Sequence, residues 1–149
     1  MNTEKFKIFA HRGMWDHKKE ENSIEAIHRS FLNGFDAETD LRIVNGEFII
    51  SHDLPKKTYD LLKLEKLLCI LKKFPERKIA LHFKYDDWRD SKALNIIEYL
   101  KPYNKQVFLF DMSLEFCETI KEKDDSVAVG VSAGDKHYHD GFANINDAL

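Results

Sequence analysis

Polar residues with chemical potential lie between positions 10 and 53, where each group ends or follows a short apolar stretch. The groups are His11-Arg12-Gly13, Glu38-Thr39-Asp40 and Ser51-His52-Asp53. Histidine titrates near neutral pH, so His11 and His52 could serve as acid and base, as cleavage of a phosphodiester requires. The guanidinium fork of Arg12 suits phosphate oxygens. The pattern therefore predicts phosphoryl chemistry.

Two carboxylates add a metal ion to this prediction. Glu38 and Asp40 are two residues apart in a predicted strand, and such residues point to the same face. Neighbouring carboxylates favour a shared divalent cation, because their mutual repulsion would otherwise push one of them to take up a proton. Asp53 is interpreted as a partner that orients His52 or a neighbouring group, with a plain turn residue as the alternative.

The elements that must position these groups are short apolar runs alternating with helical patterns, which is typical of βα units in a mainly parallel α/β sheet. Strands are predicted over residues 6–10, 35–43, 47–52, 78–84, 106–111 and 126–131. Helices are predicted over residues 23–33, 60–73, 91–101 and 114–123. His11 and His52 then follow strands at the carboxyl edge of the sheet, where sites of this class are built.

Two local signals refine this outline. Asn45-Gly46 is a turn signal, so strands 35–43 and 47–52 form either parallel neighbours or an antiparallel hairpin. Asn22 is predicted as the N-cap of the first helix, with Glu25 at the spacing of a capping box.

Composition limits the class of protein. The chain has 149 residues, of which 43% are hydrophobic and 33% charged, so we expect a single domain over 1–149 with an irregular tail at 134–149. A net charge of -3 gives no general footprint for nucleic acid, and no stretch has the apolar length of a membrane span. Cys69 and Cys117 form no CxxC pair and, with no signal-peptide pattern, favour a cytoplasmic protein.

The order of the motifs resembles the glycerophosphodiester phosphodiesterase family. Its pattern is His-Arg-Gly, Glu-Asn-Thr opening a helix, Gly-Ala-Asp with Glu-x-Asp, and His-Asp after a short strand. Over residues 6–53 this pattern is matched by His11-Arg12-Gly13, Glu21-Asn22-Ser23, Gly34-Phe35-Asp36, Glu38-Thr39-Asp40 and His52-Asp53.

The resemblance implies a TIM barrel and hydrolysis of a glycerophosphodiester, a small substrate, to an alcohol and glycerol 3-phosphate. It implies that the substrate's own hydroxyl attacks phosphorus. It implies that His11 and His52 are the general acid and base and that Arg12 binds the phosphate. Glu38 and Asp40 would bind Mg2+ or Ca2+. Glu21 and Asp53 are expected to hold neighbouring site residues in position.

The sequence departs from the family where a third metal-binding carboxylate is expected. The family has Glu-x-Lys on the next barrel strand, and this chain has His82-Phe83-Lys84. If His82 is a ligand, its imidazole shifts the preference toward Mn2+ or another transition metal; if it is not, the cation site is weak. Lys84 matches the family lysine and is predicted to contact the phosphate.

Length is the second departure. About six of the eight strands of a barrel are recognised, and a closed barrel typically needs ~200 residues or more. We expect a truncated product, a short closure, or a homo-oligomer that covers the open edges. Two functions remain open: a metal-dependent phosphodiester hydrolase, and a catalytically degenerate domain of the same fold that binds a phosphorylated ligand or a partner.

Overall fold

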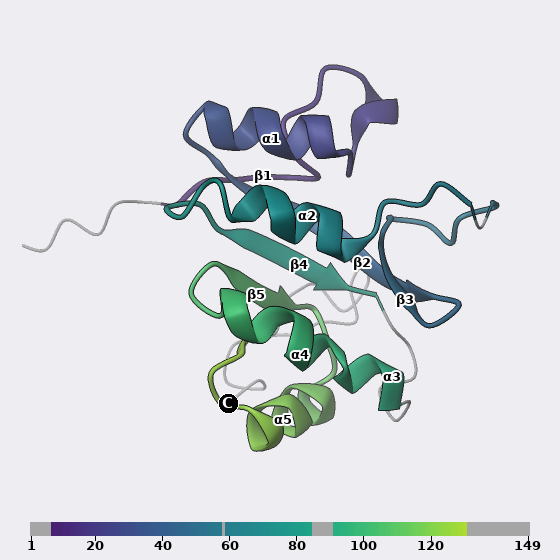
Figure 1. The fold of residues 1–149 in the computed structure, drawn as a ribbon, viewed down its shortest axis with the longest axis vertical. Coiled ribbons are helices and arrows are strands. Elements are labelled where there is room, and N and C mark those ends of the chain that lie inside the picture. The colour runs from purple at the N-terminus through teal and green to yellow at the C-terminus, as the bar shows by residue number, and fades with distance from the viewer. Residues whose placement is uncertain (1–6, 58, 85–90, 131–149) are drawn as a thin grey trace, which may run out of the picture.

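A single sheet of six strands forms the centre of the computed structural model, which describes residues 7–57, 59–84 and 91–130 (Figure 1). The strands are β1 (Phe9–Ala10), β2 (Asp36–Val44), β3 (Glu47–Ile50), β4 (Ile79–Phe83), β5 (Val107–Phe110) and β6 (Ala128–Gly130). Their order is β1-β2-β4-β5-β6, with β3 paired to β2. Five of the six strands lie within the ranges that the sequence predicts, and β2 extends one residue further, to Val44. The predicted tail at 134–149 lies outside the described residues.

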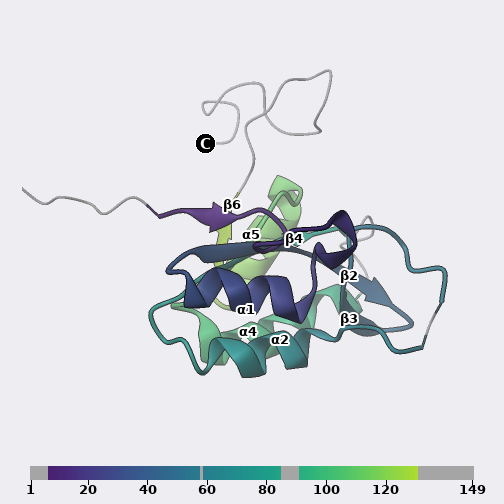
Figure 2. The same ribbon diagram turned by 90° about the horizontal axis from the view of Figure 1, so that it is seen from above.

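Each parallel strand lies beside the parallel strand that precedes it in the chain, and helices connect them. The helices are α1 (Ile24–Leu32), α2 (Leu64–Leu71), α3 (Ser91–Leu94), α4 (Ile96–Leu100) and α5 (Leu114–Lys123), with 3-10 turns η1 (Lys18–Glu20) and η2 (Lys101–Tyr103). Figure 2 shows α1, α2 and α4 on the same side of the sheet. Sequential parallel strands with helices on one side are the arrangement of a TIM barrel, which confirms the predicted fold class.

The sheet is strongly curved. β1 and β5 are separated by β2 and β4, so in a flat sheet they would lie about 14 Å apart, at three interstrand spacings. The rings of Phe9 and Phe108, one from each strand, nevertheless meet edge to face with centroids 5.7 Å apart. Val107 and Leu109 belong to the core under the helices, so Phe108 between them points to the opposite face. The sheet therefore curls around that opposite face, as the wall of a barrel does.

The core lies between the sheet and its helices because the strands alternate. Along β2, Ala37 and Leu41 join the core, while Glu38 and Asp40 point to the concave face. The helices supply leucine, isoleucine and phenylalanine at spacings of three and four residues, such as Leu64, Leu67, Leu68 and Leu71 of α2. This alternation leaves the polar residues of β2 free for the site.

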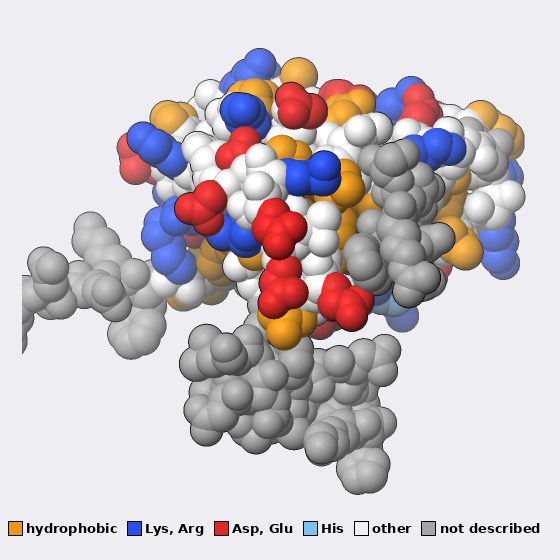
Figure 3. Space-filling view, turned by 90° about the horizontal axis from the view of Figure 1, so that it is seen from below, with side chains coloured by type: hydrophobic (Ala, Val, Ile, Leu, Met, Phe, Trp, Pro, Cys, Tyr) orange, Lys and Arg blue, Asp and Glu red, His pale blue; other side chains and the backbone are white. Residues whose placement is uncertain are grey.

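Helix α5 shows the same division between a buried and an exposed side. Phe116, Cys117 and Ile120 are buried against the sheet, whereas Glu115 and Glu118 are exposed. Figure 3 views the molecule from the side on which α5 lies and shows acidic side chains gathered in the middle of that face. In the part of the chain that the structure describes, none of the helices has the length and apolar character needed to cross a membrane.

Strand β3 is antiparallel to β2, so the hairpin alternative is correct. Asn45 and Gly46 both have positive φ, at 53° and 82°, as a type I′ turn requires. The hairpin returns the chain along the same edge of β2 that β1 occupies further back: β1 pairs with Asp36 and Ala37, and β3 with residues 41–44. His52 thus reaches the carboxyl edge by chain reversal and not at the end of a parallel strand.

Helix α2 begins at Leu64, four residues later than predicted. Leu62 O accepts a hydrogen bond from Ile50 N at 2.8 Å, and Lys63 forms a β-bridge with Ile49. These two residues extend the hairpin instead of starting the helix. The predicted helix 91–101 is also divided, into α3 and α4, at Asn95.

Candidate functional site

The turn after β1 carries His11, Arg12 and Gly13. Gly13 has a φ of +82°, and a Cβ built on it would lie 2.8 Å from the backbone carbon and Cβ of Ala26 in α1. Only glycine fits this close approach. The turn directs the backbone N–H of Arg12 at Oε2 of Glu38, which accepts its hydrogen bond at 2.9 Å.

The Arg12 side chain lies between two carboxylates. Its Nη1 donates to Oε2 of Glu21 at 2.6 Å, and its Nε lies 3.2 Å from Oδ2 of Asp40 without hydrogen-bond geometry. Burial alone would lower the pKa of Arg12, but the contacts with Glu21 and Asp40 outweigh it and raise the pKa above its ordinary value. Glu21 therefore holds the guanidinium in place, the kind of support that the resemblance implies.

Asn22 organises the site and is not the helix cap that the sequence predicts. Ser23 caps α1, accepting a hydrogen bond from Ala26 N at 3.1 Å. Asn22 has a φ of +60° and turns its side chain toward β2. Its Nδ2 donates to Oδ2 of Asp40 at 2.9 Å, and its Oδ1 accepts from Thr39 Oγ1 at 2.7 Å and from Asp40 N at 3.1 Å.

Asp40 is almost fully enclosed, with 1% of its side chain exposed. Its Oδ1 lies 3.1 Å from Lys84 Nζ and 3.3 Å from His82 Nδ1, yet among the described residues no donor makes a well-directed hydrogen bond to this oxygen. Burial would raise the pKa of Asp40, but His82, Asn22 and Lys84 outweigh burial and hold the pKa well below its usual range. Asp40 is therefore a buried anion with one oxygen left available.

Glu38 responds in the opposite direction. Burial raises the pKa of its carboxyl, and the negative charge of Asp40 adds to the rise, while the hydrogen bond from Arg12 N opposes it. A second positive charge next to Glu38 would relieve this unfavourable burial. The pair thus combines one stable anion with one that is costly to ionise.

Glu38, Asp40 and His82 can supply ligands to one metal ion. Each offers one ligand atom, and these three atoms lie within 4.8 Å of one another. Ligands about 2.1 Å from a shared ion lie about 3 to 4 Å apart, so small side-chain rotations would complete the site. The buried Oδ1 of Asp40, to which no described residue directs a hydrogen bond, is the atom that a cation would satisfy. The residues present therefore fit a divalent metal ion.

His82 also contacts a carboxylate that the sequence reasoning missed. Its Nε2 lies 2.7 Å from Oδ2 of Asp111. Asp111 follows β5 directly, as His11 follows β1, so its place at a strand end was the signal that could have identified it.

The two predicted catalytic histidines lie at the solvent-exposed rim. His11 has 70% of its side chain exposed, with Nε2 3.9 Å from Oε2 of Glu38, and Trp15 Nε1 donates to its carbonyl oxygen at 3.2 Å. His52 has 39% of its side chain exposed and contacts Asp53 Oδ1 through Nδ1 at 2.8 Å.

The hairpin brings the backbone next to His52 back to the backbone of Asp40. Ser51 N donates to the carbonyl oxygen of Asp40 at 3.1 Å, and Arg42 Nε donates to the carbonyl oxygen of His52 at 2.8 Å. The contact with His52 lowers the pKa of Asp53, so that carboxylate stays ionised and can orient the imidazole. The predicted residues are thus arranged along one edge of the sheet.

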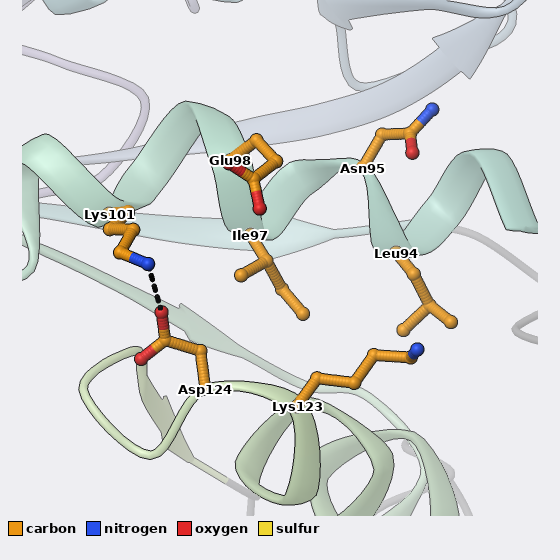
Figure 4. A pocket seen from close by; sticks show the side chains of 7 residues that line it. All are labelled: Leu94, Asn95, Ile97, Glu98, Lys101, Lys123 and Asp124. Carbon is orange, nitrogen blue, oxygen red and sulfur yellow. Dashed lines mark ion pairs between the residues drawn. The ribbon is translucent and has the colours of Figure 1, made fainter.

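A separate pocket of about 460 Å³ lies between α4 and α5 (Figure 4). Its wall includes Leu94 and Ile97, and an ion pair of 3.5 Å between Lys101 and Asp124 crosses one end. None of the predicted site residues lines it.

Comparison with solved structures identifies proteins of the same fold. A glycerophosphodiester phosphodiesterase from Parabacteroides distasonis has a TM-score of 0.72 and 21% identity, with 84% of this chain and 64% of that chain covered. A glycerophosphoryl diester phosphodiesterase from the same organism has a TM-score of 0.69 and 14% identity, with 95% and 58% covered. A glycerophosphodiester phosphodiesterase from Agrobacterium tumefaciens has a TM-score of 0.56 and 18% identity, with 84% and 66% covered.

These likenesses agree with the family resemblance seen in the sequence and, at 14% to 21% identity, they concern the fold. The chain spans less than two thirds of each of these structures. No family model matches the sequence, and neither does any curated protein.

Proposed function

We propose that this protein is a metal-dependent phosphodiester hydrolase that cleaves glycerophosphodiesters to an alcohol and glycerol 3-phosphate. The observation that carries the proposal is the gathering of two cations, Arg12 and Lys84, and two further potential metal ligands around Asp40 at the edge of the sheet. These two ligands are Glu38 and His82. The likeness of fold to three phosphodiesterases supports the same reaction class.

The cationic side chains would bind the phosphate group. Lys84 Nζ lies 3.1 Å from Asp40, and the guanidinium of Arg12, held by Glu21, lies 3.2 Å from the same carboxylate, so both cations are next to it. When a phosphodiester anion binds, Arg12 and Lys84 would exchange their contacts with Asp40 for contacts with the phosphate oxygens. A divalent ion held by Glu38, Asp40 and His82 would supply further charge stabilisation to those oxygens.

The two histidines would transfer protons. One would remove the proton from the substrate hydroxyl that attacks phosphorus, and the other would protonate the departing alkoxide, so that the phosphorus–oxygen bond to the headgroup breaks as the new one forms. The product of this step is a cyclic phosphate. Water would then open the ring to glycerol 3-phosphate, with the two histidines exchanging roles. Asp53 would keep the His52 ring oriented for either role. The exposure of the His11 and His52 side chains leaves both rings accessible to a substrate.

The test measures hydrolysis of glycerophosphodiesters and of bis(p-nitrophenyl) phosphate with added divalent metal. His11→Ala and His52→Ala should each lower kcat by at least about 100-fold, the usual contribution of one acid–base group. His17→Ala changes an exposed histidine in the loop between β1 and α1; it is the matched control and should keep full activity. Turnover that survives both site substitutions would contradict the proposal.

A second candidate function rests on a specific contact. Lys84 Nζ and His82 Nδ1 already surround Oδ1 of Asp40, which lowers the demand for a metal ion there. A protein of this kind would bind a phosphate ester without cleaving it. Retained binding of glycerol 3-phosphate, with no turnover under any divalent ion, would favour this candidate.

A further inference from the structure

We infer that the Asp111–His82 pair makes this metal site selective for a transition-metal ion, bound through Nδ1 of His82, with Asp111 as the positioning residue. The inference rests on the metal site of the proposed function and specifies which ion it takes. It concerns His82, where this chain departs from the family pattern, and the carboxylate that contacts it.

The first observation is the direction of the His82 ring. β4 pairs with β2 in parallel so that His82 lies beside Asp40, and both side chains point to the concave face. Nδ1 of the ring faces Asp40 Oδ1 at 3.3 Å, and Nε2 faces Asp111 Oδ2 at 2.7 Å. The ring is thus held between two carboxylates, one on each nitrogen.

The second observation concerns protons. A carboxylate oxygen accepts hydrogen bonds, so the 2.7 Å contact with Asp111 gives Nε2 the donor role. Nδ1 is then the nitrogen left for a metal ion, and it faces Oδ1 of Asp40 at 3.3 Å. A metal ion between them would contact both atoms, and Asp40 Oδ1 is the buried atom to which no described residue directs a hydrogen bond.

Two neighbouring features keep the ring in this orientation. The Phe110 ring packs beside that of His82, with centroids 5.2 Å apart. Asp111 has a φ of +64°, and this turn immediately after β5 presents its carboxylate to Nε2. A carboxylate that fixes the outer nitrogen of a histidine is the arrangement that orients metal-bound imidazole and raises its basicity.

The donor set then determines the ion. One imidazole nitrogen with two carboxylate oxygens suits Mn2+, Co2+ and Zn2+, whereas Mg2+ and Ca2+ prefer oxygen ligands alone. We expect Zn2+ and Co2+ to bind at least tenfold more tightly than Mg2+. Replacing the imidazole with a carboxylate should reduce this preference.

The decisive experiment records ¹⁵N chemical shifts of the His82 ring in the wild-type chain during titration with Zn2+. The expected result is a metal on Nδ1 and a proton on Nε2. A metal on Nε2, or no change at His82 when Zn2+ binds, would overturn the inference. This measurement needs neither a substitution nor catalytic activity.

Variants then separate positioning from ligation, with Co2+ affinity measured by calorimetry and by its visible spectrum. Asp111→Asn should weaken Co2+ binding about 10- to 100-fold, the usual effect of losing such a partner, and Asp111→Glu should restore part of it. His82→Glu should show a smaller preference for Co2+ over Mg2+ than wild type. Asp53→Asn, which changes the other Asp–His pair of the site, should leave Co2+ affinity unchanged. Equal Co2+ binding by wild type and Asp111→Asn would reject Asp111 as the positioning residue.

Failure of the inference and failure of the proposed function give different results. Hydrolysis supported by Mg2+ with His82 unaffected by Zn2+ keeps the function and rejects the inference. Zn2+ on Nδ1 of His82 without any hydrolysis supports the inference and points to the non-catalytic candidate.

Discussion

Asn22 Nδ2 donates a hydrogen bond of 2.9 Å to Oδ2 of Asp40 across 18 residues of sequence. The oxygen of the same amide, Asn22 Oδ1, accepts hydrogen bonds from Asp40 N and from Thr39 Oγ1. One side chain therefore connects the loop before α1 to the strand that carries the carboxylates, and it fixes the Asp40 rotamer before any ligand arrives.

Removing this amide should destabilise the fold. Asn22→Gly keeps the positive φ and leaves Thr39 Oγ1 and Asp40 N without an acceptor, and each buried group left unpaired costs about 1 to 3 kcal/mol. Urea unfolding at neutral pH would measure the loss. Asn33→Gly, at the exposed end of α1, is the control and should cost less than half as much. Equal losses would show that the Asn22 network adds no stability.

Gly13 should tolerate no side chain. Gly13→Ala combines a φ of +82° with contacts of 2.8 Å to Ala26, so we expect a loss of at least about 2 kcal/mol in the free energy of unfolding. Gly46→Ala has the same φ, but its nearest neighbours, in the Lys92 side chain, are 3.9 Å away, so only the backbone cost of about 1 kcal/mol applies. Thermal unfolding of the two variants side by side separates steric contact from backbone conformation.

The raised pKa of Glu38 predicts that replacing this carboxylate with a neutral side chain stabilises the fold at neutral pH and not at acid pH. The folded state binds the Glu38 proton more tightly than the unfolded state, so Glu38 lowers stability as pH rises from about 4.3, the ordinary value, through its higher folded pKa. In chelator-treated protein, Glu38→Gln should therefore raise Tm at pH 7 and lose this advantage near pH 4. Tm measured across that range tests the sign, with the exposed Glu98→Gln as control.

A bound metal ion should reverse the order of Tm between wild type and Glu38→Gln. Binding to the folded state adds RT ln(1 + [L]/Kd), and wild type offers both carboxylates while Glu38→Gln offers one. We expect a divalent ion at saturating concentration to raise the Tm of wild type above that of the variant at pH 7. An equal rise in both proteins would remove Glu38 from the ligand set.

Arg12→Lys should impair phosphate binding even though the charge is kept. The arginine contacts Glu21 and Asp40 through two different nitrogens, and a single ammonium cannot reproduce that geometry. We expect kcat/KM for a glycerophosphodiester to fall about 10- to 100-fold, the equivalent of one charged hydrogen bond. Arg29→Lys, which alters an exposed pairing with Asp16, is the control.

The sequence predicts the strands well, and the Asn45-Gly46 pair predicts the turn that returns the chain to the site. Apolar runs locate all six strands, because strand burial leaves a local signal. Asn45-Gly46 indicates the hairpin but not its consequence, since the return of His52 to the level of Asp40 depends on the register between β2 and β3. The 3.6-residue pattern also continued into residues 62 and 63, where pairing with β3 prevails over helix formation.

Long-range partners were harder to predict. Asparagine and serine are both favoured as N-caps, so the sequence does not distinguish Asn22 from Ser23. Only the fold shows that the Asn22 amide reaches β2 while Ser23 caps the helix. Asp111 pairs with His82 because β4 and β5 are neighbours, so its role depends on strand order and not on a motif. The polar residues of a site are predictable from type and spacing; their hydrogen-bond partners are not.

The sequential order of the strands has a kinetic consequence. Each parallel strand pairs with the parallel strand before it across an intervening helix, and parallel pairing of this kind forms slowly because the connecting loop must close first. The first unit, through β3, contains Glu38 and Asp40, but Lys84 and His82 arrive only with β4. Docking of β4 therefore neutralises two carboxylates held close together, and substitutions at Lys84 should slow refolding as well as weaken the finished site.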